Sequence, residues 1–174
     1  MLTKTVPYLK LIKDPLFKSS QYTQKYFSEN SNVSALKETH LTSYHKDILK
    51  AKMVPFAGYS MPVSYPDGII KEHLHCRKNV GLFDVSHMGQ VKMHGKDAQA
   101  FLERMTVADV EALPQGKSTL SVIMNNKGGI KDDCTITRDD KNEFYVVLNA
   151  GCKDTDLAHF RKHLNTAEWK GKYV

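Results

Sequence analysis

The sequence has no long hydrophobic run, and its apolar stretches fall far short of the ~20 residues that a membrane-spanning helix needs. We therefore expect a soluble protein with no membrane partner. Charge of one sign does not dominate either, because 25 Lys and Arg residues stand against 19 Asp and Glu residues, a formal net charge of +6. The lysines are scattered and are not clustered with aromatic residues, which argues against a nucleic-acid partner. An acidic protein or an anionic small molecule fits this charge equally well.

Cysteine is scarce, with only Cys76, Cys134 and Cys152, and no Cys-x-x-Cys pair occurs. An odd and sparse count indicates free thiols in a reducing compartment and argues against a disulfide framework. The run HLHC (residues 73–76) holds possible metal ligands. A zinc site needs three or four ligands, and the sequence offers no second cluster, so we expect no metal site.

The first 35 residues lack arginine but hold five lysines against only Asp14 and Glu29. The segment is basic and mildly amphipathic, without a long apolar stretch, which fits a mitochondrial presequence better than a secretory signal. Pro7 and Pro15 would interrupt a helix there, and a disordered basic arm is the alternative. We predict a presequence or disordered arm over residues 1–35 and a folded region over residues 36–174.

The folded region predicts short helices mixed with antiparallel hairpins. Helices are expected over residues 39–50, over residues 68–79, after Asp97 as a capping residue, and after Gly151. Apolar residues expected to pack from these helices are Leu41, Tyr44, Ile48, Leu49, Ile69, Ile70, Leu74, Cys76, Phe101, Leu102, Met105, Leu157, Phe160 and Leu164. Strands are expected over residues 82–85, 90–94, 120–124, 130–137 and 144–149, and residues 53–63 read as extended chain with turns. Because strands and helices do not alternate, the predicted fold class is α+β.

Two successive aspartates, Asp132 and Asp133, lie inside a predicted hairpin strand, where aspartate is disfavoured. Such a pair can serve as a base or as a hydrogen-bond acceptor for a ligand amine. From spacing alone, a solvated or turn-stabilising pair is the more common arrangement. The period of two places Asp132 on the more apolar face, together with Cys134 and Ile136.

Asp84, Ser86 and His87 lie close together and raise the possibility of a hydrolase. A nucleophile elbow needs Gly-x-Ser-x-Gly between a strand and a helix, and that pattern does not occur in the chain. Neighbouring residues on an extended chain also point to opposite faces, so Ser86 and His87 cannot easily pair. Nucleophilic catalysis is therefore disfavoured.

Four segments fall in one order and spacing: MVPFAGYSMPV (residues 53–63), GLFDVSHMG (81–89), GGIKDD (128–133) and YVVLNAGC (145–152). Together they resemble the N-terminal, folate-binding portion of the aminomethyltransferases, the T-protein of the glycine cleavage system. The resemblance runs from about Leu36 to about Phe160. It implies an antiparallel α+β fold that binds tetrahydrofolate, in the mitochondrial matrix.

The resemblance also implies roles for individual residues. The second aspartate of the GGIKDD segment, Asp133, is the implied catalytic residue, which contacts the reactive nitrogens of tetrahydrofolate. Met88 is implied to line the pteridine pocket, and Asn149 and Asp132 to lie at the folate site. From the residues alone, a place in the ordinary core is preferred for Met88. For Asn149, the end of a strand and a place at the folate site are equally good interpretations.

The implied reaction transfers the aminomethyl carbon from the lipoylated H-protein to tetrahydrofolate, giving methylenetetrahydrofolate and ammonia. Family members are longer than this chain, so residues 36–174 would form an incomplete folate-binding region. A folate-binding or assembly protein of the same fold without catalysis is one alternative, and an inactive fragment is another. A flavin-linked relative is disfavoured because Gly-x-Gly-x-x-Gly is absent from the chain.

Overall fold

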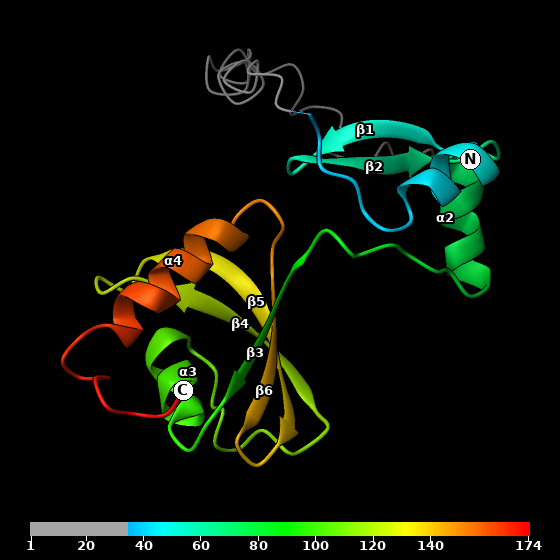
Figure 1. Ribbon diagram of the computed structural model, residues 1–174. Helices are drawn as coiled ribbons and strands as arrows, with labels where there is room; N and C mark the ends of the chain where they lie inside the picture. Colours follow the sequence, from blue (N-terminus) through cyan, green and yellow to red (C-terminus); the bar gives the residue numbers. More distant parts are fainter. Residues whose placement is uncertain (1–34) are drawn as a thin grey trace, which may run out of the picture. The chain divides into compact units, whose positions relative to one another are not determined.

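The computed structural model describes residues 35–174, so the hypothesised presequence or arm lies almost entirely outside the described residues. The chain divides into two units, Met1–Leu36 and Lys37–Val174, and every element named below belongs to the second. Helices and antiparallel sheets are mixed, which confirms the predicted α+β class (Figure 1). Within the described residues, no helix has the length and apolar character needed to cross a membrane.

A four-stranded antiparallel sheet forms the larger part of the described fold (Figure 1). Its strands are β3 (Gly89–His94), β4 (Ser118–Met124), β5 (Ile130–Asp140) and β6 (Glu143–Leu148), in the spatial order β3-β6-β5-β4. Along β6 every second residue is buried, namely Phe144, Val146 and Leu148. The predicted strands over 90–94, 120–124, 130–137 and 144–149 are thus confirmed, with some ends moved by a few residues.

One core covers a single face of this sheet, and helices α3 (Ala98–Met105) and α4 (Lys153–Leu164) supply its second layer. The predicted stripe of α3, Phe101, Leu102 and Met105, is buried. From α4, Phe160 is buried, and Leu157 and Leu164 pack against the core in part. Trp169 adds an edge-to-face contact with Phe101, with ring centroids 4.9 Å apart. This packing holds the strand ends that carry the candidate site.

Asp97 precedes α3 as predicted, but its side chain makes no capping hydrogen bond to the helix. Its carboxylate instead accepts hydrogen bonds from the Tyr173 N–H at 3.0 Å and from Lys96 Nζ at 2.9 Å. The prediction of a side-chain cap was therefore wrong. The physical reason is that the C-terminal segment lies beside the start of α3 and competes for the same oxygen.

The N-terminal part of the described chain holds a two-stranded hairpin, β1 (Lys52–Phe56) and β2 (Tyr59–Ser64). Its two-residue turn is Ala57-Gly58, both at positive φ (48° and 79°), the backbone that a tight hairpin turn with Gly at its second position adopts. The segment over residues 53–63, expected to be extended with turns, is this hairpin.

The two helices flanking this hairpin pack less than predicted. Residues 42–48 are helical, with one π-helical turn, η4 (Tyr44–Ile48), so the helix is shorter than the predicted range 39–50. Its buried residues are Thr42 and His45, whereas the expected packing residues Leu41, Tyr44, Ile48 and Leu49 are exposed. Helix α2 (Ile69–Lys78) lies where predicted, but it has no buried residue. Both helices carry the predicted apolar residues, but no other element in the described part of the chain packs against them and buries them.

The strand predicted over residues 82–85 is not formed. A β-strand needs a neighbour that completes its backbone hydrogen bonds, and this segment pairs with no other strand of residues 35–174. Leu82, Phe83 and Val85 are exposed. The chain then turns, with the Met88 N–H donating to the Val85 carbonyl at 3.0 Å.

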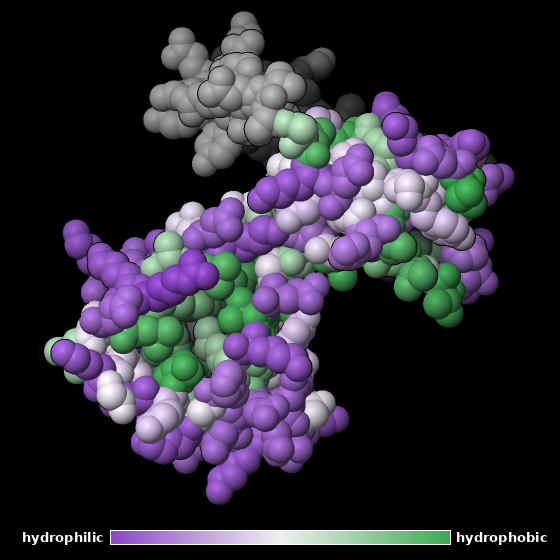
Figure 2. All heavy atoms as spheres, viewed as in Figure 1, coloured by the Kyte–Doolittle hydropathy of each residue, from purple (hydrophilic) through white to green (hydrophobic). Residues whose placement is uncertain are grey.

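A groove of about 760 Å³ lies between β2, α2 and the segment that follows α2. Leu74, Val80 and Phe83 line it and are exposed, and Val80 is 90% exposed. Figure 2 shows apolar surface around the end of α2. The groove contains neither Asp132, Asp133 nor Asn149, so it is separate from the aspartate pair.

Candidate functional site

Three of the predicted site residues come together through the register of the sheet. Gly89 pairs with Leu148, and Leu148 pairs with Cys134. One step beyond this row stand Met88, which precedes β3, Asn149, which follows β6, and Asp133, which lies near the start of β5. Met88 and Asp133 are 45 residues apart in the chain, and Asn149 is 16 residues after Asp133, yet the register places all three in a line across β3, β6 and β5.

Asn149 joins the two aspartates directly. Its side-chain Nδ2 donates to Asp133 Oδ1 at 2.8 Å and to Asp132 Oδ1 at 3.0 Å. A longer contact of 3.4 Å reaches the backbone carbonyl of Asp133. Asn149 directly follows the last residue of β6. Its side-chain amide orients both carboxylates, so its role goes beyond ending the strand.

The two aspartates have different surroundings. Asp133 is exposed, whereas Asp132 is half-buried and its Oδ2 is buried without a hydrogen-bond partner. Asp132 shares its face with the buried Cys134 and Ile136, as the period of two predicted. The exposed carboxylate of Asp133 is therefore the one available to a ligand from solvent.

A third carboxyl group, Asp156 of α4, lies under the pair and was not predicted. It is 1% exposed, and neither of its oxygens has a partner that donates to it. Burial is the largest cause that raises the pKa of Asp156 to about 7, and hydrogen bonding and repulsion from the adjacent Asp132 act in the same direction. The sequence did hold a signal, because Asp156 stands one helical turn before Phe160 and so shares the buried face of the helix.

The thiols beside these carboxyl groups are unreactive in character. Burial raises the pKa of Cys134 to about 12, and Asp132, Asp133 and Asp156 contribute in the same direction. The pKa of Cys152 is also raised by burial and by the same three aspartates. Both thiols stay neutral at physiological pH, so neither is an activated nucleophile.

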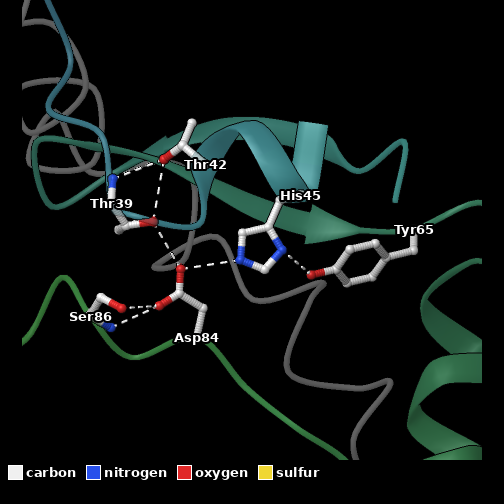
Figure 3. Close-up of polar contacts among 6 residues, drawn as sticks. All are labelled: Thr39, Thr42, His45, Tyr65, Asp84 and Ser86. Atoms are coloured by element: carbon white, nitrogen blue, oxygen red, sulfur yellow. Dashed lines mark hydrogen bonds and ion pairs between the residues drawn. The ribbon is translucent and has the colours of Figure 1, made fainter. Parts of the chain in front are cut away.

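Asp84 holds the turn that precedes Met88 (Figure 3). Its Oδ2 accepts from Thr39 Oγ1 at 2.9 Å and lies 3.1 Å from His45 Nε2, and its Oδ1 accepts from the N–H of Ser86 at 2.9 Å. The Tyr65 hydroxyl lies 2.9 Å from the other ring nitrogen of His45. Burial acts to raise the pKa of Asp84, but hydrogen bonds from Ser86, Thr39 and His45 outweigh it and lower the pKa to about 2.

This network is not a hydrolase triad. The Ser86 hydroxyl donates to Asp84 Oδ1 and not to a histidine, so no base stands ready to remove its proton. His87 is buried between Phe56 and Tyr59, at ring centroid distances of 5.6 and 6.2 Å, and does not join the network. The network instead ties the N-terminal helix, the end of β2 and the turn before Met88 together.

A lysine that the sequence did not single out lies next to Met88. Lys153 Nζ donates to the carbonyl of His87 at 3.2 Å and to the Tyr59 hydroxyl, and it lies 4.6 Å from the Tyr59 ring centroid. The approach depends on Gly89, because a Cβ there would lie 2.8 Å from Lys153 Cβ. The site therefore has an acidic side at Asp133 and a cation near Met88.

The family described as GCVT N-terminal domain matches residues 41–172. The chain belongs to the aminomethyltransferase family. It corresponds to the N-terminal portion of that family, as the four motifs predicted. The aminomethyltransferase match covers every described element of the site.

Curated aminomethyltransferases are similar to this chain over most of its length. The mitochondrial aminomethyltransferase of Dictyostelium discoideum is 51% identical over 154 residues, which are 88% of this chain and 37% of that protein. The mitochondrial enzyme of Pisum sativum is 49% identical over 138 residues, 79% of this chain and 34% of that protein. The chain thus spans about a third of the length of these relatives. The mitochondrial location predicted from the sequence is the one in their names.

A solved structure agrees with this family. The glycine cleavage system aminomethyltransferase T from Bartonella henselae superposes with a TM-score of 0.72 at 39% identity. The match covers 75% of this chain and 36% of that one. The aminomethyltransferase fold is therefore reproduced over most of the described residues.

Proposed function

We propose that this chain carries the tetrahydrofolate-binding N-terminal part of a glycine cleavage aminomethyltransferase of the mitochondrial matrix. The reaction takes the aminomethyl carbon from the lipoyl arm of the H-protein. Tetrahydrofolate accepts the carbon, which gives 5,10-methylenetetrahydrofolate, while ammonia leaves and the lipoyl sulfur is released as a thiol. The observation that carries this proposal is the exposed Asp133 carboxylate held by Asn149 at 2.8 Å.

The chemistry of the site fits a reduced folate. The reactive nitrogens of tetrahydrofolate carry hydrogen, and an ionised, exposed carboxylate is an acceptor for such donors. Asn149 fixes Asp133 by donating to one oxygen, which leaves the second oxygen to receive a ligand N–H. Half-buried Met88, on the same line across the sheet, offers the adaptable apolar surface that a flat ring needs.

In this assignment Asp133 holds the folate nitrogen and takes up its proton as that nitrogen attacks the aminomethyl carbon. A positioned general base contributes about 10²–10⁴-fold to a rate. Asp132 does not contact the ligand, because its side chain turns toward the core. Its role is to hold Asn149, and through Asn149 to orient Asp133.

The H-protein is the proposed partner, and the net charge of +6 favours an acidic surface on it. Lys153 gives the site a fixed positive charge near Met88. The sequence similarity to mitochondrial aminomethyltransferases supports the matrix location.

The substitution Asp133→Asn tests the proposal. It keeps the shape of the side chain but removes the proton acceptor, so tetrahydrofolate binding should persist while transfer falls by about 100-fold or more. Binding is measured by calorimetric titration with tetrahydrofolate, and transfer by methylenetetrahydrofolate formation from aminomethylated H-protein. Asp139→Asn, an exposed aspartate near the other end of β5, is the matched control and should change neither.

Three results would count against this function. A folded wild-type chain without saturable tetrahydrofolate binding would contradict it. Binding without transfer in the wild type would favour a folate-binding protein that is not catalytic. Unchanged turnover in Asp133→Asn would remove Asp133 from the mechanism.

A further inference from the structure

Asp156 presents a physical problem that the proposed function does not explain. A carboxyl group that is 1% exposed, with no donor to either oxygen, would be strongly destabilised if it were ionised. The acidic group that acts on it among the described residues is Asp132, whose Oδ2 is also buried and without a partner. Two carboxylates facing each other in a buried place cannot both be charged without a large cost.

A metal ion is the usual alternative explanation for buried carboxylates. Across residues 35–174, no group of three or more histidine, cysteine, aspartate and glutamate side chains is arranged to hold one. The charge of Lys131 acts to lower the pKa of Asp156, and this effect is smaller than those of burial and Asp132. A shared proton is the remaining way to neutralise the pair.

We propose that Asp156 is a positioning residue: it shares one proton with Asp132, and this hydrogen-bonded pair fixes the Asn149 amide against Asp133. With the proton on Asp156, its hydroxyl donates to the buried Oδ2 of Asp132. The other oxygen of Asp132 then remains free to accept from Asn149 Nδ2 at 3.0 Å. The same Nδ2 reaches Asp133 Oδ1 at 2.8 Å, which completes a path from the buried acid to the exposed carboxylate.

Through this path Asp156 and Asp132 influence ligand binding without contacting the ligand, because they fix the orientation of Asp133. The proton-sharing pair carries a single negative charge, and the Asn149 amide donates a hydrogen bond to it. If the shared proton is lost, two like charges face each other, and Asp132 must move away from Asp156. Such a movement disturbs Asn149, and with it the orientation of Asp133. The role in ligand binding rests on the proposed function, whereas the shared proton does not.

The other groups around Asp156 do not supply a competing titration. Cys134 and Cys152 remain neutral because burial raises the pKa of both thiols. Lys131 is on the same strand as Asp132 and acts to lower the pKa of Asp156. Asp133 is exposed to solvent.

The first measurement is a ¹³C NMR titration of aspartate carboxyl groups in the whole chain. One carboxyl should titrate near neutral pH in the wild type, and this transition should be absent in Asp156→Asn. The side-chain NH₂ signals of Asn149 should shift with the same midpoint. Asp154→Asn is the matched control, since Asp154 lies in the same first turn of α4 but is exposed, and it should keep the transition.

The second measurement is tetrahydrofolate affinity by calorimetry in the same variants. Asparagine can still donate to Asp132, so Asp156→Asn should keep most of the affinity but lose the decrease that the wild type shows above neutral pH. Asp156→Ala cannot donate and should weaken binding by about tenfold, the scale of one lost buried hydrogen bond. Rescue by asparagine separates positioning from simple packing.

The outcomes distinguish the two proposals. Absence of any carboxyl transition near neutral pH, or its persistence in Asp156→Asn, would overturn the shared proton. Equal affinity in Asp156→Ala and the wild type would overturn the positioning role. A wild type that does not bind tetrahydrofolate would overturn the proposed function together with that role, while the NMR titration would still decide the shared proton. If Asp156→Ala does not fold, the pH dependence of Asp156→Asn remains decisive.

Discussion

The Asn149 amide donates to Asp133 Oδ1 at 2.8 Å, although the two residues are 16 positions apart on different strands. The same nitrogen reaches Asp132, whose side chain leaves the opposite face of β5. One asparagine at the end of β6 therefore couples an exposed carboxylate to a buried one. This is the relationship on which the candidate site depends.

Replacement of Asn149 by Asp should destabilise the fold at neutral pH. A third carboxylate would replace the donor between Asp132 and Asp133, at a cost of about 1–3 kcal/mol for the lost hydrogen bonds and the added repulsion. The loss should shrink as the pH falls below about 4, where carboxyl groups are protonated. Urea unfolding at both pH values measures it.

Asn142→Asp, in the exposed turn between β5 and β6, is the control and should have little effect at either pH. A loss of stability at position 149 that did not depend on pH would speak against charge repulsion as its cause.

Replacement of Asp84 by Asn should weaken the network that holds the turn before Met88. The pKa of Asp84 is lowered in the folded chain to about 2, so its contribution is present above the ordinary aspartate pKa and is lost as the pH falls toward 2. The linkage amounts to about 2 kcal/mol at neutral pH. Stability curves of the variant and the wild type should converge in acid.

Asp67→Asn serves as the control, because Asp67 forms an exposed ion pair with Lys71 and should contribute little. A difference between Asp84→Asn and the wild type that stayed constant down to about pH 2 would contradict the linkage.

The three cysteines should react with a thiol reagent in a fixed order. Cys76 is exposed and should react at once, half-buried Cys152 should react slowly, and Cys134 should react only after unfolding, because it is buried with a pKa of about 12. Mass spectrometry after timed labelling gives the order. Early labelling of Cys134 in the native chain would show that the core face of β5 opens.

The sequence predicted well wherever one residue pattern decides one element. The alternation in β6 and the stripe of α3 each place apolar side chains on a face that the sheet core then buries. The face of Asp132 followed from the same local rules. The strand prediction over residues 82–85 was wrong, because a strand requires a neighbouring strand and a local residue pattern does not show whether one is present. The prediction that the Asp97 side chain caps α3 was wrong, because the N–H of Tyr173, distant in sequence, donates to its carboxylate.

The sequence by itself determined the family, the α+β class, the order of the strands along the chain and the pair of aspartates. Only the tertiary structure decided that Asn149 lies beside both carboxylates, and that Asp156 lies beneath them. Local periodicity assigns a side chain to a face, but the burial of a carboxyl group and its hydrogen-bond partners depend on segments that meet only after folding. The pairing of β5 with β6 and the packing of α4 bring these groups together, and their protonation follows from that arrangement.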